Sequence, residues 1–120
     1  MNIRQLTYNK LNNATTAGTA VYGGGRAASA TPPYIVFFVV SENRLYAHDG
    51  EVGLSRPRVQ VSCFADTYTG AVDLAGEVIA ELESWAEVSH AMQDNEQDLY
   101  EEDTGLYHIP LDFFIGYRRD

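Results

Sequence analysis

The sequence holds a single cysteine, Cys63, among its 120 residues. One cysteine cannot close an intramolecular disulfide, so the fold depends on no oxidising compartment. The longest apolar run, Tyr34–Val40, is far shorter than the roughly 20 residues that span a bilayer. The N-terminus alternates apolar and polar side chains and lacks the apolar core of a signal peptide. We therefore expect a protein without a membrane segment, assembled in the cytoplasm.

Positive charge is missing from a long part of the chain. Between Val59 and Tyr117 there is no Lys or Arg, against 13 Asp and Glu, and the net charge of the whole chain is −9. Proteins that bind nucleic acid cluster Lys and Arg against phosphate, so this distribution disfavours such a role. Two interpretations stay open, a solvated acidic surface and an attraction for a basic partner.

Length and composition predict one domain covering residues 1–120, because a second core would need more chain. With 45% hydrophobic and 21% charged residues, the chain has the balance of an ordinary globular protein. A core of modest size forms without disulfides or metals at this length.

Apolar spacing predicts two helices. Ile3, Leu6, Thr7 and Leu11 recur at helical intervals, which predicts a short N-terminal helix. A second, amphipathic helix is expected from about residue 68 to 86, with Thr67 as its N-cap. Its apolar positions end at Trp85.

The remaining periodic segments predict strands. Tyr34–Val40 is apolar on both faces, typical of a central strand, and a glycine-bearing loop separates it from the alternating strand Arg58–Phe64. Tyr107–Tyr117 alternates strictly, and Pro110 predicts a free edge or a bulge nearby. Residues 88–95 are ambiguous, with Val88, His90 and Met92 on one face if they form a strand. The expected fold is α+β, a small antiparallel or mixed sheet of four to five strands with both helices on one face.

No pattern of residues supports catalysis, a cofactor or a metal ion. Asp103-Thr104-Gly105 matches the tripeptide of aspartic proteases, but acidic residues precede it and a strand follows, which favours a turn. The acidic run from Asp94 to Asp103 lacks the glycine that a calcium loop needs at its sixth position, where Leu99 stands. Cys63 falls on the apolar face of a strand, where it is expected to be buried, and His48-Asp49 falls in a polar turn. A cysteine hydrolase built on Cys63 is the weaker alternative.

Several signatures occur in a recognisable order. They are Pro33-Tyr34-Ile35-Val36-Phe37, the segment from Tyr46 through Asp49-Gly50 and Gly53-Leu54-Ser55 to Arg58-Val59-Gln60-Val61-Ser62-Cys63, then Ala65, Thr67-Tyr68 and Ala71, and later Asp98-Leu99-Tyr100, Gly105-Leu106-Tyr107 and Leu111-Asp112-Phe113. From Val21 to Arg118 this order resembles the tail completion, or tail terminator, proteins of long-tailed bacteriophages. The departures are the small-residue loop Gly23–Thr31 and the acidic stretch before Tyr100, where many relatives carry Arg near Gln97.

The resemblance implies a structural virion protein without enzymatic activity or cofactor. Such a subunit assembles with itself into a ring, commonly of six copies, at the head-proximal end of the tail tube in the neck of the virion. There it ends tube growth and docks to the head connector, so its implied partners are the tail tube protein and a head completion protein. DNA passes through the ring without specific binding.

Three surfaces are expected to serve such assembly. The small-residue loop Gly23–Thr31, called the glycine loop, and the aromatic strand Tyr107–Tyr117 are candidate subunit contacts. Core packing is the alternative for the strand. The candidate loop residues are Gly23, Gly24, Gly25 and Arg26. As a hypothesis, an acidic surface repels DNA in the lumen. Its candidate residues are Glu77, Glu81, Glu96, Asp98, Glu101 and Glu102.

The same acidic half fits a different class of protein. A monomeric acidic module that mimics DNA and occupies the groove of a basic partner would use the negative charge without forming a ring. Self-association separates this alternative from the tail terminator.

Overall fold

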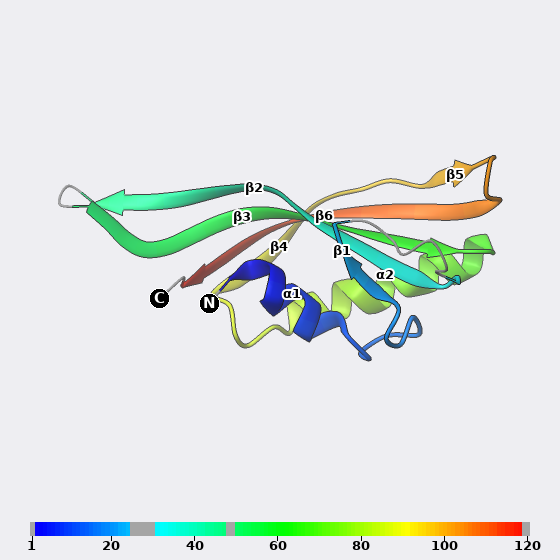
Figure 1. Ribbon diagram of the computed structural model, residues 1–120, viewed down its shortest axis with the longest axis horizontal. Coiled ribbons are helices and arrows are strands. Elements are labelled where there is room, and N and C mark those ends of the chain that lie inside the picture. Colours follow the sequence, from blue (N-terminus) through cyan, green and yellow to red (C-terminus); the bar gives the residue numbers. More distant parts are fainter. Residues whose placement is uncertain (1, 25–30, 48–49, 119–120) are drawn as a thin grey trace.

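A computed structural model describes residues 2–24, 31–47 and 50–118, which form two helices and one mixed six-stranded sheet (Figure 1). The α+β prediction is confirmed, with a sheet one strand larger than expected. In chain order the elements are α1 (Ile3–Leu11), β1 (Val21–Gly23), β2 (Tyr34–Ala47), β3 (Gly50–Ala65), α2 (Tyr68–Glu83), β4 (His90–Glu96), β5 (Leu99–Glu101) and β6 (Leu106–Arg118). Neither helix is long and apolar enough to cross a membrane, judged over the described residues.

The strands lie in the order β1-β2-β3-β6-β4, and β5 pairs with β6 beyond the end of β4. Only the pair β1 and β2 is parallel. Both helices lie on the same side of the sheet (Figure 1), with α2 against β3 and β6, and α1 against β1 and β2. No helix of the described chain covers the opposite side, which we call the outer face.

The helix boundaries follow from their caps. The Asn2 side chain accepts a hydrogen bond from the Gln5 backbone N–H, and α1 ends at Leu11 with Asn12 as its C-cap. Thr67 caps α2 by accepting from the Gly70 backbone N–H at 3.0 Å, which confirms the predicted N-cap. The helix ends at Glu83, so the expected extension to residue 86 is wrong. Trp85 follows the C-cap Ser84 but is still buried in the core.

Replacing Thr67 with alanine removes this cap. We expect the free energy of unfolding to fall by about 1 kcal/mol, because an amide at the start of α2 loses its acceptor. Thr69→Ala, an exposed position two residues further on, is the matched control and should change stability by less than half as much. Denaturant titrations of both variants check this, and equal losses would contradict the capping role.

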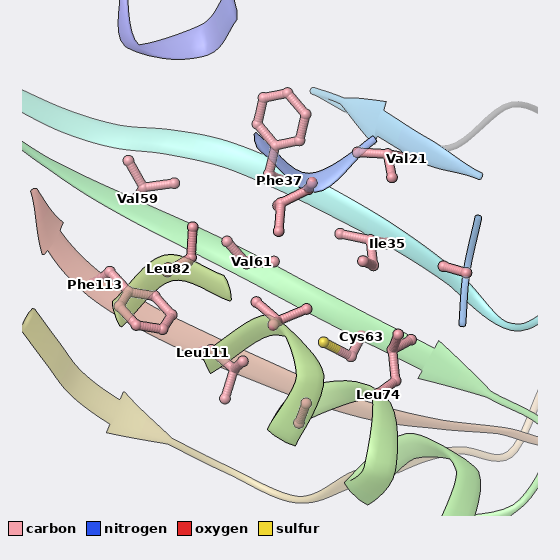
Figure 2. Close-up of a cluster of buried hydrophobic side chains, with 14 of the residues drawn as sticks. Val21, Ile35, Phe37, Val59, Val61, Cys63, Leu74, Leu82, Leu111 and Phe113 are labelled. Atoms are coloured by element: carbon pink, nitrogen blue, oxygen red, sulfur yellow. The ribbon is translucent and has the colours of Figure 1, made fainter. Parts of the chain in front are cut away.

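The core lies between the sheet and the helices. Val59, Val61 and Cys63 of β3 are fully buried, as their alternation predicts, and pack with α2 residues such as Leu74 and Leu82 (Figure 2). Burial of these side chains is the main stabilising contribution to the fold. The odd-numbered residues of β6 complete the core, so the core-packing alternative for the aromatic strand is correct; they are Ile109, Leu111, Phe113, Ile115 and Tyr117.

The expectation that Tyr34–Val40 is buried on both faces is correct only for its first half. Residues 34–37 are buried, but Phe38 and Val40 of β2 are 41% and 56% exposed. In β4, Ala91 packs on the core whereas Met92 is 62% exposed, and Val88 is buried just before the strand begins. His90 and Met92 share one face of β4, as expected of a strand, whereas Val88 precedes the strand.

Pro110 lies at an interruption in the partner strands of β6. The pairing with β4 ends at Glu96 opposite Leu111, and the pairing with β5 begins at Leu99 opposite His108. The Gln97 backbone N–H donates to the Pro110 carbonyl, so Pro110 faces the gap between the two strands. The missing proline N–H thus lies where β6 has no strand partner on that side among the described residues, which fits the free edge expected near Pro110.

Strands β2 and β3 extend far beyond their predicted ends. They pair with each other out to Ala47 opposite Gly50, whereas β6 pairs with β3 only as far as Leu54 opposite Arg118. Residues 45–47 and 50–54, which β6 flanks only at Leu54, therefore form a largely two-stranded ribbon, here called the arm, that projects from one end of the domain (Figure 1). The domain is accordingly elongated, with extents of 52 × 25 × 24 Å. The predicted turn at His48-Asp49 lies outside the described residues.

Candidate assembly surfaces

The expected glycine loop begins later than predicted. Gly23 is the last residue of β1 and pairs with Phe37, and a Cβ added to it would lie 2.9 Å from the Phe37 ring. Gly23 is therefore part of the sheet, and its assignment to the loop is wrong. Gly24 has a φ of +81°, which favours glycine, and its N–H donates to the Phe37 carbonyl. The other two candidates, Gly25 and Arg26, lie outside the described residues.

A hollow of about 360 Å³ opens at the edge of β2 beside these glycines. Its lining includes Arg4, an exposed residue of α1, together with Phe38 and Val39. The parallel pairing with β1 stops at Phe37, so this hollow lies where the edge of β2 loses its neighbour.

Two of the six acidic candidates hold the N-terminal region against α2. Glu77 accepts hydrogen bonds from the Thr16 backbone N–H at 3.1 Å and from the Thr16 hydroxyl at 2.6 Å. Glu81 pairs with Lys10 of α1 at 3.3 Å. Both side chains have partners within the chain, and Lys10 partly compensates the charge of Glu81.

The other four acidic candidates follow one another along the chain from the end of β4 to the turn after β5. Asp98 accepts a 2.6 Å hydrogen bond from the Tyr68 hydroxyl, which raises the pKa of Tyr68. Glu101 accepts from Thr104 at 3.0 Å, within the turn that Asp103-Thr104-Gly105 was expected to form. Gly105 closes that turn with a φ of +71°. The structure therefore separates the acidic candidates into two groups, Glu77 with Glu81, and Glu96 with Asp98, Glu101 and Glu102.

His108 lies on the outer face beside the second group. Its ring stacks on Phe64 at 4.2 Å between centroids, and its Nδ1 is 4.0 Å from a Glu101 carboxylate oxygen. Its Nε2 is buried and has no hydrogen-bond partner among the described residues. Burial lowers the pKa of His108, and the Glu101 charge opposes this to a smaller extent.

The lowered pKa predicts a loss of stability on acidification. The unfolded chain takes up the His108 proton first as the pH falls through about 6.5, so protonation favours unfolding. We expect wild type to lose more stability between about pH 7.5 and 5.5 than His108→Phe, which keeps an aromatic ring against Phe64. Chemical denaturation at several pH values measures the difference, and parallel profiles for the two proteins would overturn the assignment.

The outer face also carries a polar network that sequence reasoning missed. Arg58 of β3 lies 3.2 Å from Asp112 of β6 and 3.5 Å from Asp94 of β4, and Gln60 donates to Asp112. Asp112 is only 8% exposed, so its charge is compensated by these contacts. The sequence feature that could have indicated this network is Asp112, the single carboxylate in the strand Tyr107–Tyr117.

Next to this network is an apolar hollow of about 390 Å³, lined by Arg56, His90, Met92 and Phe114. The His90 ring packs directly over Gly116, where any side chain would overlap it. The outer face therefore combines exposed apolar side chains with one compensated ionic network, a composition typical of interaction surfaces.

Comparison with known proteins agrees with these features. A family model described as "Tail completion protein gp17" matches residues 9–118 of the chain. The chain belongs to this family. The resemblance inferred from the residue order is thereby confirmed, and this tail completion protein is a structural, tail-related virion protein.

Among solved structures, a chain from the "Virion of native gene transfer agent (GTA) particle" has the same fold. Its TM-score is 0.74 and its sequence identity 17%, and the match covers 97% of this chain and 94% of that one. No curated protein sequence matches the tail completion protein studied here.

Cys63 does not have the surroundings of a catalytic nucleophile in this tail completion protein. Its side chain is fully buried, and burial raises the pKa of the thiol well above its ordinary value. The charges of Glu96 and Glu77 raise it further. Because the thiolate is the reactive form, this cysteine is a buried apolar residue of the core, as expected from its place in β3.

Proposed function

We propose that this tail completion protein forms a ring, of six copies, at the head-proximal end of the tail tube. The ring ends growth of the tube and offers the surface to which the head connector binds. Membership of the tail completion family carries this proposal, and the open architecture of the domain supports it.

The arm supports an assembly role. An isolated two-stranded ribbon is marginally stable in water, yet residues 45–47 and 50–53 continue the β2 and β3 ladder past the point where β6 ends. Contact with a neighbouring subunit or with the tube would supply the third surface that such a ribbon lacks. The exposed apolar side chains of the outer face, such as Met92 and Val40, support the same role.

We further propose that the acidic group around β5 borders the lumen. Glu96, Asp98, Glu101 and Glu102 lie in a part of the chain that holds no Lys or Arg, so their field repels phosphate. Glu81 contributes less, because its charge is paired with Lys10, and Glu77 lies apart from this group on α2. DNA would slide through such a lumen without being held.

Sedimentation of the purified chain, with and without tubes of tail tube protein, tests the proposal. We expect a discrete oligomer, or a species that sediments with the tubes in a small fixed ratio. A strict monomer that ignores tubes and binds a basic protein would instead support the DNA-mimic alternative.

A further inference from the structure

Two edges of the sheet lack a neighbour in the described chain. At one edge of the sheet, β4 pairs with β6 along one of its sides, and no described strand pairs with it along the other. At the other edge, β1 covers β2 only from Ile35 to Phe37. The edge of β2 from Phe38 to Ala47 therefore has no partner strand among the described residues. Unpaired strand edges are templates for pairing with another chain.

We propose that β4 of one copy pairs antiparallel with the open edge of β2 in the next copy, so that the sheet continues across the subunit boundary. This inference rests on the proposed ring. The two edges belong to different strands of the chain, so the contact is head-to-tail, the type that closes into rings when the rotation permits. Strand directions fit, because β2, β3, β6 and β4 alternate antiparallel and β4 is antiparallel to β2.

The apolar side chains at the two edges are complementary. Met92 of β4 is 62% exposed, and Phe38 and Val40 of β2 are 41% and 56% exposed. Four residues lie at the same level across the sheet of one domain, each paired with the next. They are Met92 of β4, Phe114 of β6, Arg58 of β3 and Ser41 of β2. Copies placed side by side without an offset along the strands therefore bring Met92 next to Val40 and Ser41. Pairing would cover side chains that the separate domain leaves in water.

Charge and shape agree with the same alignment. By the same register, Glu96 at the end of β4 lies level with Phe37, where the pairing of β1 stops. The hollow of about 360 Å³ opens there and contains the exposed Arg4. The acidic end of β4 would thus meet Arg4 of the next copy. Asp94 is already paired with Arg58 within the chain, so the opposite charges that this pairing joins are those of Glu96 and Arg4.

Engineered cysteines test the contact and its direction. Within one chain, β2 and β4 are separated by β3 and β6, which places them about 14 Å apart at about 4.8 Å per strand. A disulfide requires Cα atoms within about 7 Å, so the two edges cannot be bridged within one chain. We propose the double variants Val40→Cys with Met92→Cys, and Phe38→Cys with Met92→Cys. Mild oxidation, alone and on tail tubes, should give a ladder of linked dimers, trimers and higher species in at least one of them.

The single variants and wild type are the controls. In a head-to-tail contact each single variant has no partner thiol, and Cys63 is fully buried, so neither should cross-link above background. Single variants that form dimers as readily as the double variants would show self-paired edges and overturn the proposal. Failure of both double variants to form a ladder also overturns it. If a ring still forms by sedimentation in that case, the ring proposal stands and only the edge pairing is wrong.

A second measurement uses charge. Met92→Lys places a lysine at the β4 edge, a device by which edge strands avoid pairing. We expect the assembled fraction to fall at least tenfold while the thermal unfolding curve is unchanged. Ala80→Lys, at an exposed position of α2 away from both edges, adds the same charge and should assemble as wild type. Equal assembly of the two variants would contradict the edge pairing.

Discussion

Replacing Phe113 with alanine should lower the free energy of unfolding by about 3–5 kcal/mol. The ring is fully buried in β6, where it packs with Leu82 and Leu111 between the sheet and α2 (Figure 2). Truncation removes a large apolar surface from the core and leaves a cavity that its neighbours fill only in part. Since single domains are stable by only about 5–15 kcal/mol, much of the variant should be unfolded under mild denaturant. Equilibrium denaturation measures the loss.

Phe38→Ala is the matched control for this prediction. It removes the same side chain from the same sheet, but Phe38 projects from the outer face and is 41% exposed. Its truncation should cost less than about 1.5 kcal/mol, because little buried surface is lost. Equal losses for the two variants would contradict the assignment of the core to the helix side of the sheet.

Shortening the arm should separate folding from assembly. In the proposed variant an Asn-Gly turn replaces residues 45–54, which keeps the pair Arg44 and Ser55 and closes a tight hairpin. The arm pairs with the remaining sheet only through Leu54 and Arg118, so we expect thermal stability to change by about 1 kcal/mol or less. Binding to tail tubes should weaken roughly tenfold or more, equivalent to about 1.4 kcal/mol of contact energy.

Circular dichroism and co-sedimentation with tubes distinguish the outcomes for the shortened arm. A folded variant that no longer sediments with tubes fits an arm that acts in assembly. A folded variant that binds tubes as well as wild type would show that the arm does not act in assembly.

The spacing of apolar residues along the sequence predicted the core well. The alternation of Val59, Val61 and Cys63 and the spacing of Ala75, Val78 and Leu82 place apolar side chains on one face, and the structure buries those faces. Helix ends were less predictable. Trp85 continues the apolar spacing past the true end of α2, because a side chain packs on the core whether or not its backbone is helical.

Features that depend on distant or missing partners could not be predicted in this way. Strand β1 is three residues long and forms only because β2 lies beside it, so its own sequence carries little signal. The apolar run Tyr34–Val40 indicated burial on both faces, but no part of the described chain covers Phe38 and Val40. A hydrophobic run shows that a surface tends to be covered, and does not show whether the same chain covers it.

The assembly surfaces illustrate the same limit. The acidic candidates are alike in charge but lie in different parts of the fold. Glu77 accepts a hydrogen bond from Thr16, whereas Asp98 accepts one from Tyr68 near β5. The glycine loop was recognised from its small residues, yet Gly23 belongs to the sheet because only a glycine fits against the Phe37 ring. Such contacts depend on tertiary packing, which local composition does not encode.

Electron microscopy of tubes polymerised from tail tube protein, with and without this chain, tests the ring most directly. The account predicts that added chain limits tube length and leaves a ring-shaped density at one end only. Tubes that grow equally long, with no added density at either end, would contradict it.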